Sequence, residues 1–456
     1  MKLFAKNILL SSGWAKNQVL TIDKGVISTI DSGSAEQAEY VLETVIPGMV
    51  NCHSHAFQRA FAGFSEQGSE GKDSFWTWRS IMYQFLEQLT VEDAELIATQ
   101  LYIEMLKSGY TRVAEFHYLH HNTQGNCYEK LGEMAKALFN ASHQSGLGLT
   151  MLPVLYQYSG FGEQAPNHGQ RRFINSTEQF NQLVSECAEL SKSTPNTNVG
   201  IAPHSLRATG KDAMVSAIAH VRSIDDKAPI HIHIAEQQKE VDDCLAHYGK
   251  RPVQWLLDNL DVDEHWCLIH ATHIDDNELA GMVQTGAIAG ICPTTEANLG
   301  DGIFPTTEFM AQNGTIAIGS DSHISVNPVE ELRLLEYAQR LIKQQRAILA
   351  SNETPSVGLN LWQKASLGGA QSTSSNTGEL AVGKQADLLV LDQNKLNCFA
   401  TGEQYNLDSL IFASQTNCIK DVMVNGEWVI QDHTHALEAD IQKRFSQLLT
   451  KLSNNQ

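Results

Sequence analysis

Two histidines one residue apart end a short apolar run near the start of the chain. Residues 47–50 lead through Asn51 and Cys52 into His53 and His55. Side chains two positions apart on a strand point to the same side, so both imidazoles could bind one metal ion. Because a single His-x-His pair is also compatible with unrelated polar residues at a strand end, the metal hypothesis needs further ligands.

Three more apolar runs end in residues that bind metals or transfer protons: His233 followed by Glu236, then His270, then Asp321. Histidine is a good zinc ligand, so we expect His233 and Asp321 to complete the ligand set. Glu236 would carry protons. His270 and Asp321 would position and deprotonate the attacking water, whose pKa a metal lowers from 15.7 to about 7. His231 shares a face with His233 but lies one layer deeper, so we interpret it as a core histidine.

Apolar strands alternate with helical patterns through the middle of the chain, which is typical of a parallel sheet with helical crossovers. Strands are expected near residues 45–53, 111–117, 147–155, 198–203, 229–235, 266–271, 286–292 and 315–320. Helices are expected at residues 91–107, 176–191, 275–284 and 328–349. Eight such units predict an α/β fold with a closed (β/α)8 barrel. The active site of such a barrel lies at the carboxyl ends of the strands, where the residues above fall.

Both ends of the chain have a sequence pattern that differs from that of the middle and predicts short strands and turns. Strands are expected at residues 6–10, 18–22, 26–30, 383–391 and 421–430. The last of these folds back at an Asn425-Gly426 hairpin turn. We predict that residues 1–46 and 375–456 form one small composite β-sandwich domain, and that residues 47–374 form the barrel. The low-complexity residues 366–378 are interpreted as a return linker between them.

Composition limits the class of protein. The chain has 456 residues, 42% of them hydrophobic, which suits a barrel with one appendage. Its formal charge is 32 − 52 = −20, which argues against nucleic acid or a membrane surface as the partner. An anionic small-molecule substrate must then be held by local cations. Eight cysteines without a CxxC pair, no signal-peptide core and no apolar run near the roughly 18 residues of a membrane span predict a cytoplasmic protein with reduced thiols.

The metal-site residues follow one another in a characteristic order. His53-Ser54-His55 comes first, then His233 with Glu236, then His270, and finally Ser320-Asp321. This order resembles the amidohydrolase superfamily, in its mononuclear deaminase branch. The resemblance implies a (β/α)8 barrel with a β-sandwich made from both chain ends, in agreement with the patterns above. Members with two metals carboxylate a lysine on a middle barrel strand, and this chain shows no such lysine, so we expect one divalent ion per chain, Zn²⁺.

Residues 47–59, 114–118, 202–207 and 293–302 carry a narrower resemblance, to the formimidoylglutamate deiminase family. It implies zinc-dependent hydrolysis of N-formimino-L-glutamate to N-formyl-L-glutamate and ammonia, in histidine degradation. It also implies five substrate-binding residues: Gln58, Arg79, Tyr118, His204 and Arg207. Two arginines suit a substrate with two carboxylates, because guanidinium groups pair with carboxylates bidentately. We further expect a homodimer.

These assignments have alternatives. The polar candidates could be ordinary lining of a barrel mouth, and either arginine could form a structural salt bridge, with Arg59 binding the substrate instead. A deaminase of a nucleobase or another aromatic amidine would share every metal-site residue, and only the paired arginines argue against it. A binding protein with a structural metal is a further alternative, although structural zinc sites usually close with four ligands rich in cysteine.

Overall fold

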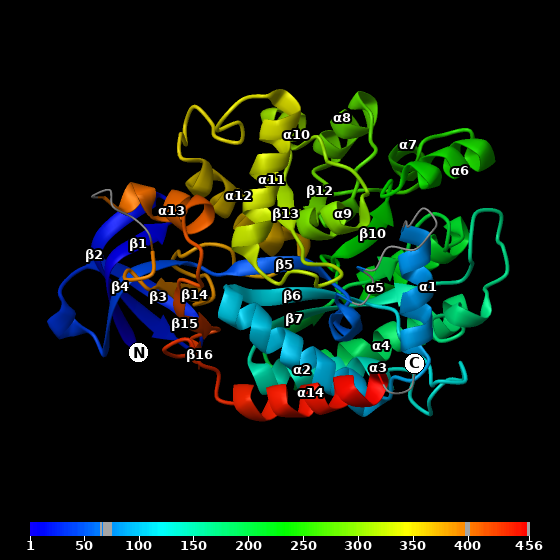
Figure 1. The fold of residues 1–456 in the computed structure, drawn as a ribbon, viewed down its shortest axis with the longest axis horizontal. Coiled ribbons are helices and arrows are strands. Elements are labelled where there is room, and N and C mark those ends of the chain that lie inside the picture. The colour runs from blue at the N-terminus through cyan, green and yellow to red at the C-terminus, as the bar shows by residue number, and fades with distance from the viewer. Residues whose placement is uncertain (64–65, 67–74, 397–401, 454–456) are drawn as a thin grey trace.

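The computed structural model describes residues 1–63, 66, 75–396 and 402–453, and its centre is a parallel barrel (Figure 1). The barrel strands are β5 (Met49–Ser54), β6 (Tyr110–His117), β7 (Gly148–Leu155), β8 (Thr197–Val199), β9 (Ala202–Pro203), β10 (Ile230–Ile234), β11 (Trp266–His270), β12 (Ile288–Ile291) and β13 (Ile316–Ile318). They pair in the order β10-β11-β12-β13-β5-β6-β7-β8, and β9 also pairs with β7. A bridge between Ile201 and Ile230 closes the ring. The expected (β/α)8 barrel is confirmed, with β8 and β9 sharing one strand position.

The barrel strands are apolar because both of their faces are buried. β10, with the sequence Ile-His-Ile-His-Ile, is buried at every position, as are β11 and β12. Strands covered by helices outside and packed side chains inside are near-continuous apolar runs. The surroundings of His231 agree with its interpretation as a core residue, because its Nε2 lies 2.7 Å from the carbonyl oxygen of Ser372.

Helices surround the barrel (Figure 1). They are α1 (Phe75–Leu86), α2 (Val91–Ser108), α3 (Glu133–Ser145), α4 (Thr177–Ser193), α5 (Lys211–Ile224), α6 (Gln238–Tyr248), α7 (Pro252–Asn259), α8 (Asp276–Thr285), α9 (Pro293–Leu299), α10 (Thr306–Ala311), α11 (Pro328–Lys343) and α12 (Val357–Ser372). Their ends follow from local sequence. The Thr90 hydroxyl caps α2 by accepting from the Asp93 N–H, and Gly109, at φ +107°, ends it directly before β6. α11 ends before the expected residue 349 because Gln344 adopts a left-handed φ of +55°.

A second, mixed sheet is built from both ends of the chain. Its strands are β1 (Lys2–Leu10), β2 (Gly13–Asp23), β3 (Val26–Ser32), β4 (Tyr40–Pro47), β14 (Leu388–Leu391), β15 (Ile419–Val424) and β16 (Glu427–Ile430). They pair in the order β16-β15-β14-β4-β1-β2-β3. Asn425 and Gly426 both have positive φ and join β15 to β16, as expected for this hairpin turn. The chain ends therefore come together in one sheet, as predicted.

The C-terminal helix α14 (Glu438–Ser453) leaves this sheet and lies along α2 (Figure 1). Its residues Phe445, Leu448 and Leu452 belong to the same buried apolar cluster as Ile97 of α2. Helix α14 thus packs against the outside of the barrel. The domain boundaries expected after residues 46 and 374 stay a prediction.

The strand expected at residues 45–53 is two strands that meet at Gly48. β4 ends at Pro47 in the chain-end sheet, and β5 begins at Met49 in the barrel. Gly48 lies so close to β6 that a Cβ there would be 2.3 Å from the Thr111 Cγ2 atom. The chain can pass from one sheet into the other here because glycine has no side chain.

The linker expected at residues 366–378 was wrong, because α12 continues through Ser372. The small residues of this segment serve close packing instead of flexibility. A Cβ at Gly368 would lie 1.9 Å from the Ile316 carbonyl oxygen, and one at Gly369 would lie 2.7 Å from the Val50 Cβ. The glycines therefore let α12 approach β13 and β5 from outside the barrel.

Two further expectations concern the whole chain. No helix among the described residues is both long enough and apolar enough to cross a membrane. The cysteines that the structure describes are free thiols, as predicted: Cys52, Cys127, Cys187, Cys244, Cys267, Cys292 and Cys418.

Candidate active site

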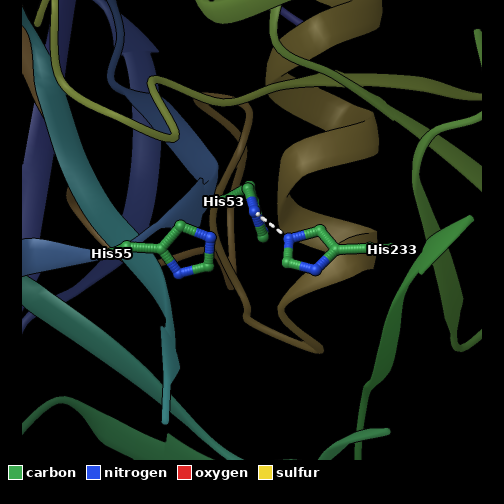
Figure 2. A group of neighbouring side chains, drawn as sticks. All are labelled: His53, His55 and His233. Atoms are coloured by element: carbon green, nitrogen blue, oxygen red, sulfur yellow. Dashed lines mark hydrogen bonds between the residues drawn. The ribbon is translucent and has the colours of Figure 1, made fainter. Parts of the chain in front are cut away.

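Four expected ligands meet at the carboxyl ends of three barrel strands. His53 lies on β5 with His55 directly after it, His233 lies on β10, and Asp321 follows β13. The His53 and His233 Nε2 atoms are 2.9 Å apart, and the three histidines face one another (Figure 2). Asp321 Oδ1 lies 3.4 Å from His53 Nε2 and 3.2 Å from His55 Nε2. Strands far apart in the chain thus place these donors around one point.

The spacing and chemistry of these donors fit one divalent ion. Tetrahedral zinc with bonds of about 2.0–2.1 Å places its ligands about 3.3 Å from one another, close to the distances seen here. Burial lowers the pKa of His53, and lowers that of His55 to about 3, so both imidazoles are neutral at pH 7 and can offer a lone pair. His55 Nδ1 lies 2.9 Å from the Phe116 carbonyl oxygen, which orients its Nε2 toward the other ligands.

Glu236 and His270 lie beside the ligand cluster. His270 Nε2 is 3.7 Å from Glu236 Oε1 and 3.8 Å from Asp321 Oδ2, and its Nδ1 is 3.3 Å from Glu296 Oε1. Burial lowers the pKa of His270, but the surrounding carboxylates, Glu236 first, outweigh burial and raise it. Burial raises the pKa of Glu236. A cationic imidazole between carboxylates can both hold and move protons here.

Unusual backbone conformations mark the same strand ends. Ala235, His270, Ala271 and Asp321 have φ between +45° and +69°, although none of them is glycine. Such residues cost about 1–3 kcal/mol each and persist only where the surroundings hold them. The sharp turns follow the apolar strands and aim Glu236, His270 and Asp321 into the mouth of the barrel.

One pocket joins the ligand cluster to the expected substrate-binding residues. It is lined by His55, Gln58, Arg79, Met82, Tyr83, Tyr118, Tyr156, Phe173, His204, Arg207, His233, Glu236, His270, Leu299 and Asp321. All five residues expected to bind substrate are in this list. His53 lies beneath the pocket and is fully buried.

The polar wall next to the ligands comes from the three segments that follow β5, β6 and β9. Gln58 lies on the short helix η2 (Ala56–Phe61), and its Nε2 donates to the Tyr118 hydroxyl over 3.1 Å. Its buried Oε1 has no hydrogen-bond partner among the described residues. The His204 ring lies 4.9 Å from the His233 ring, and burial lowers the pKa of His204 so that it is neutral. These groups can accept or donate to a polar ligand beside the metal position.

The two arginines expected to bind substrate line the pocket, whereas the alternative residue, Arg59, does not. Arg207 follows β9 and is only 9% exposed. Arg79 lies on α1, and its Nε donates to the Tyr83 hydroxyl over 2.5 Å. Arg59 instead pairs with Glu104, its Nε lying 2.6 Å from the carboxylate. The pocket is therefore lined by two guanidinium groups as well as by Glu236 and Asp321.

Residues that the sequence prediction missed support the ligands from behind. The buried Glu115 accepts from the Ser54 hydroxyl and the Ala56 N–H, both over 2.6 Å, and burial raises its pKa to about 7. His323 lies 3.1 Å from the Ser54 hydroxyl and 3.0 Å from that of Ser320. The available signal for Glu115 was a carboxylate between the apolar residues Ala114 and Phe116 of the buried strand β6. Hydrogen bonds of this kind fix the loops that carry the ligands.

This barrel and site define a known class of protein. A family model described as the amidohydrolase family matches residues 44–429, and the chain belongs to that family. A formimidoylglutamate deiminase of Pseudomonas aeruginosa is 47% identical over 99% of this chain and 99% of its own length. The crystal structure of an amidohydrolase from Brucella melitensis superposes with a TM-score of 0.94 at 45% identity, covering 99% of both chains. An adenosine deaminase structure from Xanthomonas campestris with bound zinc has a TM-score of 0.81 at 18% identity over 99% and 98%, which shows the fold alone.

Proposed function

We propose that this amidohydrolase hydrolyses N-formimino-L-glutamate. Water adds to the formimino carbon, the C–N bond to the terminal nitrogen breaks, and the products are N-formyl-L-glutamate and ammonia. The single observation that carries the substrate assignment is the pocket in which the ligand cluster and two arginines share one cavity. The relative that is 47% identical bears the name of this activity.

The pocket has a reacting end and a binding end. At the reacting end, His53, His55, His233 and Asp321 would hold one Zn²⁺, which when bound acts as a Lewis acid and lowers the pKa of water. At the binding end, Arg79 and Arg207 would pair with the substrate carboxylates. The absence of a lysine on the middle barrel strands supports a single ion.

The chain's own residues would move the protons. His270 and Asp321 orient the attacking water and take its proton. Glu236, whose pKa burial raises, delivers a proton to the departing nitrogen so that ammonia leaves instead of an amide ion. Gln58, Tyr118 and His204 hold the formimino group and the adjacent carboxylate by hydrogen bonds.

The cellular setting belongs to the same proposal. The reaction would be a step of histidine degradation in the cytoplasm, carried out by a homodimer. Size-exclusion chromatography with light scattering tests the dimer directly.

Ammonia release by the purified, zinc-loaded protein tests the function. Formiminoglutamate is compared with guanine, adenosine and cytosine at equal concentrations. We expect turnover of formiminoglutamate alone. Deamination of a base or nucleoside without turnover of formiminoglutamate would replace the proposal with the aromatic amidine alternative.

A further inference from the structure

We propose that the hydroxyl groups of Tyr83 and Tyr156 bind the side-chain carboxylate of the substrate, so that the distal anion site consists of two phenols between two arginines. This inference rests on the proposed function and names the part of the pocket that selects for a second carboxylate. Neither tyrosine was expected from the sequence, and both line the pocket.

Tyr156 presents a buried donor to the pocket. It follows β7 directly and is 2% exposed. Its oxygen accepts a hydrogen bond of 2.8 Å from Gln170 Nε2, and Gln170 is itself fully buried. Among the described residues no acceptor takes the remaining O–H hydrogen of Tyr156. A buried donor without an acceptor is costly, so a ligand that accepts from it gains affinity.

Tyr83 presents a second donor to the pocket, from helix α1. It lies on α1 one turn after Arg79, whose Nε donates to the Tyr83 oxygen. The phenol hydrogen is then left to donate, and the described part of the chain offers it no acceptor. Both phenols lie close enough to Arg207 to influence the pKa of its guanidinium. The two donors therefore face the same space as the two positive charges.

This space lies at the far end of the pocket from the metal position. The Tyr118 ring is 5.0 Å from the His55 ring, and the His204 ring is 4.9 Å from the His233 ring, so Tyr118 and His204 stand next to the ligands. Tyr156 comes after His204, at 4.4 Å between ring centroids. Tyr83 and Arg79 follow on α1. A formimino group at the metal would thus leave the side-chain carboxylate, the more distant of the two, among the phenols.

The position of Tyr83 depends on a glycine. A Cβ at Gly169 would lie 2.6 Å from the Tyr83 Cδ2 atom, so the short helix η3 (His168–Gln170) can pack against α1 only with glycine here. The next residue, Gln170, holds Tyr156. One short segment therefore fixes both phenols, although it contributes no group to the metal site.

Phenylalanine substitutions distinguish the contribution of the hydroxyl groups from that of the aromatic rings. Tyr83→Phe and Tyr156→Phe keep ring packing and remove only the proposed donors. Tyr158→Phe is the matched control, because Tyr158 is on the same loop but lines an outer groove instead of the pocket. Each zinc-loaded variant is assayed with formiminoglutamate and with formiminoglycine, which keeps the α-carboxylate and lacks the side-chain one. Metal content and thermal stability are measured alongside.

A hydrogen bond to a charged group contributes about 1.5–3 kcal/mol, so each pocket variant should lose roughly 10- to 100-fold in kcat/KM for formiminoglutamate. We expect the loss in KM more than in kcat, less than threefold change with formiminoglycine, and no change in the control. The Ki of L-glutamate as a competitive inhibitor should rise by a similar factor.

Two outcomes would overturn the inference. One is a loss below twofold in both pocket variants. The other is an equal loss with both substrates, which would mean that the tyrosines only support the site. A parent enzyme that releases no ammonia from formiminoglutamate would instead contradict the proposed function, so the two failures are distinguishable.

Discussion

Replacement of Arg207 by methionine tests the binding end of the pocket. Arg207 is 9% exposed and lines the pocket with the ligand cluster. Methionine has a similar length and can fill the space without a charge. The variant therefore removes the guanidinium while leaving the proposed metal ligands in place.

Two effects are expected, one on kcat/KM and one on the pH profile. A charged hydrogen bond contributes about 1.5–3 kcal/mol, so kcat/KM for formiminoglutamate should fall roughly 10- to 100-fold. If the contact is equally strong in the ground and transition states, the loss appears as a raised KM. Arg207 also lowers the pKa of Glu236 and Glu240. Without this positive charge both carboxylates bind protons more tightly. Because Glu236 must carry a proton to donate it, the alkaline limb of the pH profile should move to higher pH.

The assay follows ammonia release between pH 6 and 9, with Arg59→Met as the matched control. Arg59 pairs with Glu104 and does not line the pocket, so its replacement should leave kcat/KM within about twofold. A formimino compound without carboxylates should be nearly insensitive to the Arg207 variant. An Arg207→Met enzyme within twofold of the parent, or an equal loss in the Arg59 variant, would refute the reasoning.

Three further expectations follow from other parts of the chain. Glu236→Gln should keep the metal and lose about 10²–10⁴-fold in kcat, and loss of zinc by elemental analysis would contradict its assignment to proton transfer. Elemental analysis should also find one zinc ion per chain in the parent enzyme, and two zinc ions per chain would exclude a single-metal site. A chelator should abolish activity, and added zinc should restore it. Burial raises the pKa of Asp387 to about 6, so this carboxyl group binds its proton more tightly in the folded than in the unfolded chain. The free energy of unfolding should therefore fall as the pH rises from about 4 to about 6. Asp387→Asn should flatten this slope, by at most about 1.4 kcal/mol per pH unit in urea unfolding, and an unchanged slope would count against it.

Much of the fold could be predicted from the sequence because the barrel strands are buried on both faces. Their apolar runs end abruptly at polar residues, and both the strand positions and the ligand cluster follow from that pattern. The chain-end sheet was predictable for a similar reason, since the Asn425-Gly426 turn has a strong local signal.

What could not be predicted depends on contacts between distant segments. Gly48, Gly368 and Gly369 look like a strand interior and a linker, but each is a point of close approach to a backbone or side chain elsewhere. Tyr83 and Tyr156 carry no local motif, and only folding places them beside the arginines. A glycine-rich composition indicates that a segment can be flexible, but only the folded structure shows whether its glycines are needed for close packing.

The pairing of β5 has a consequence for biosynthesis. One edge of this strand pairs with β13, where Ile318 faces Asn51, and the strand before it, β4, pairs with β14. Asn51 and Ser320, which hydrogen bond to each other, are 269 residues apart. While the ribosome is still making the middle of the protein, His53 and His55 are already synthesised but have neither their neighbouring strand nor Asp321. The proposed ligand set would therefore be complete only when nearly the whole barrel has emerged, so a bound ion would enter the complete site late in maturation.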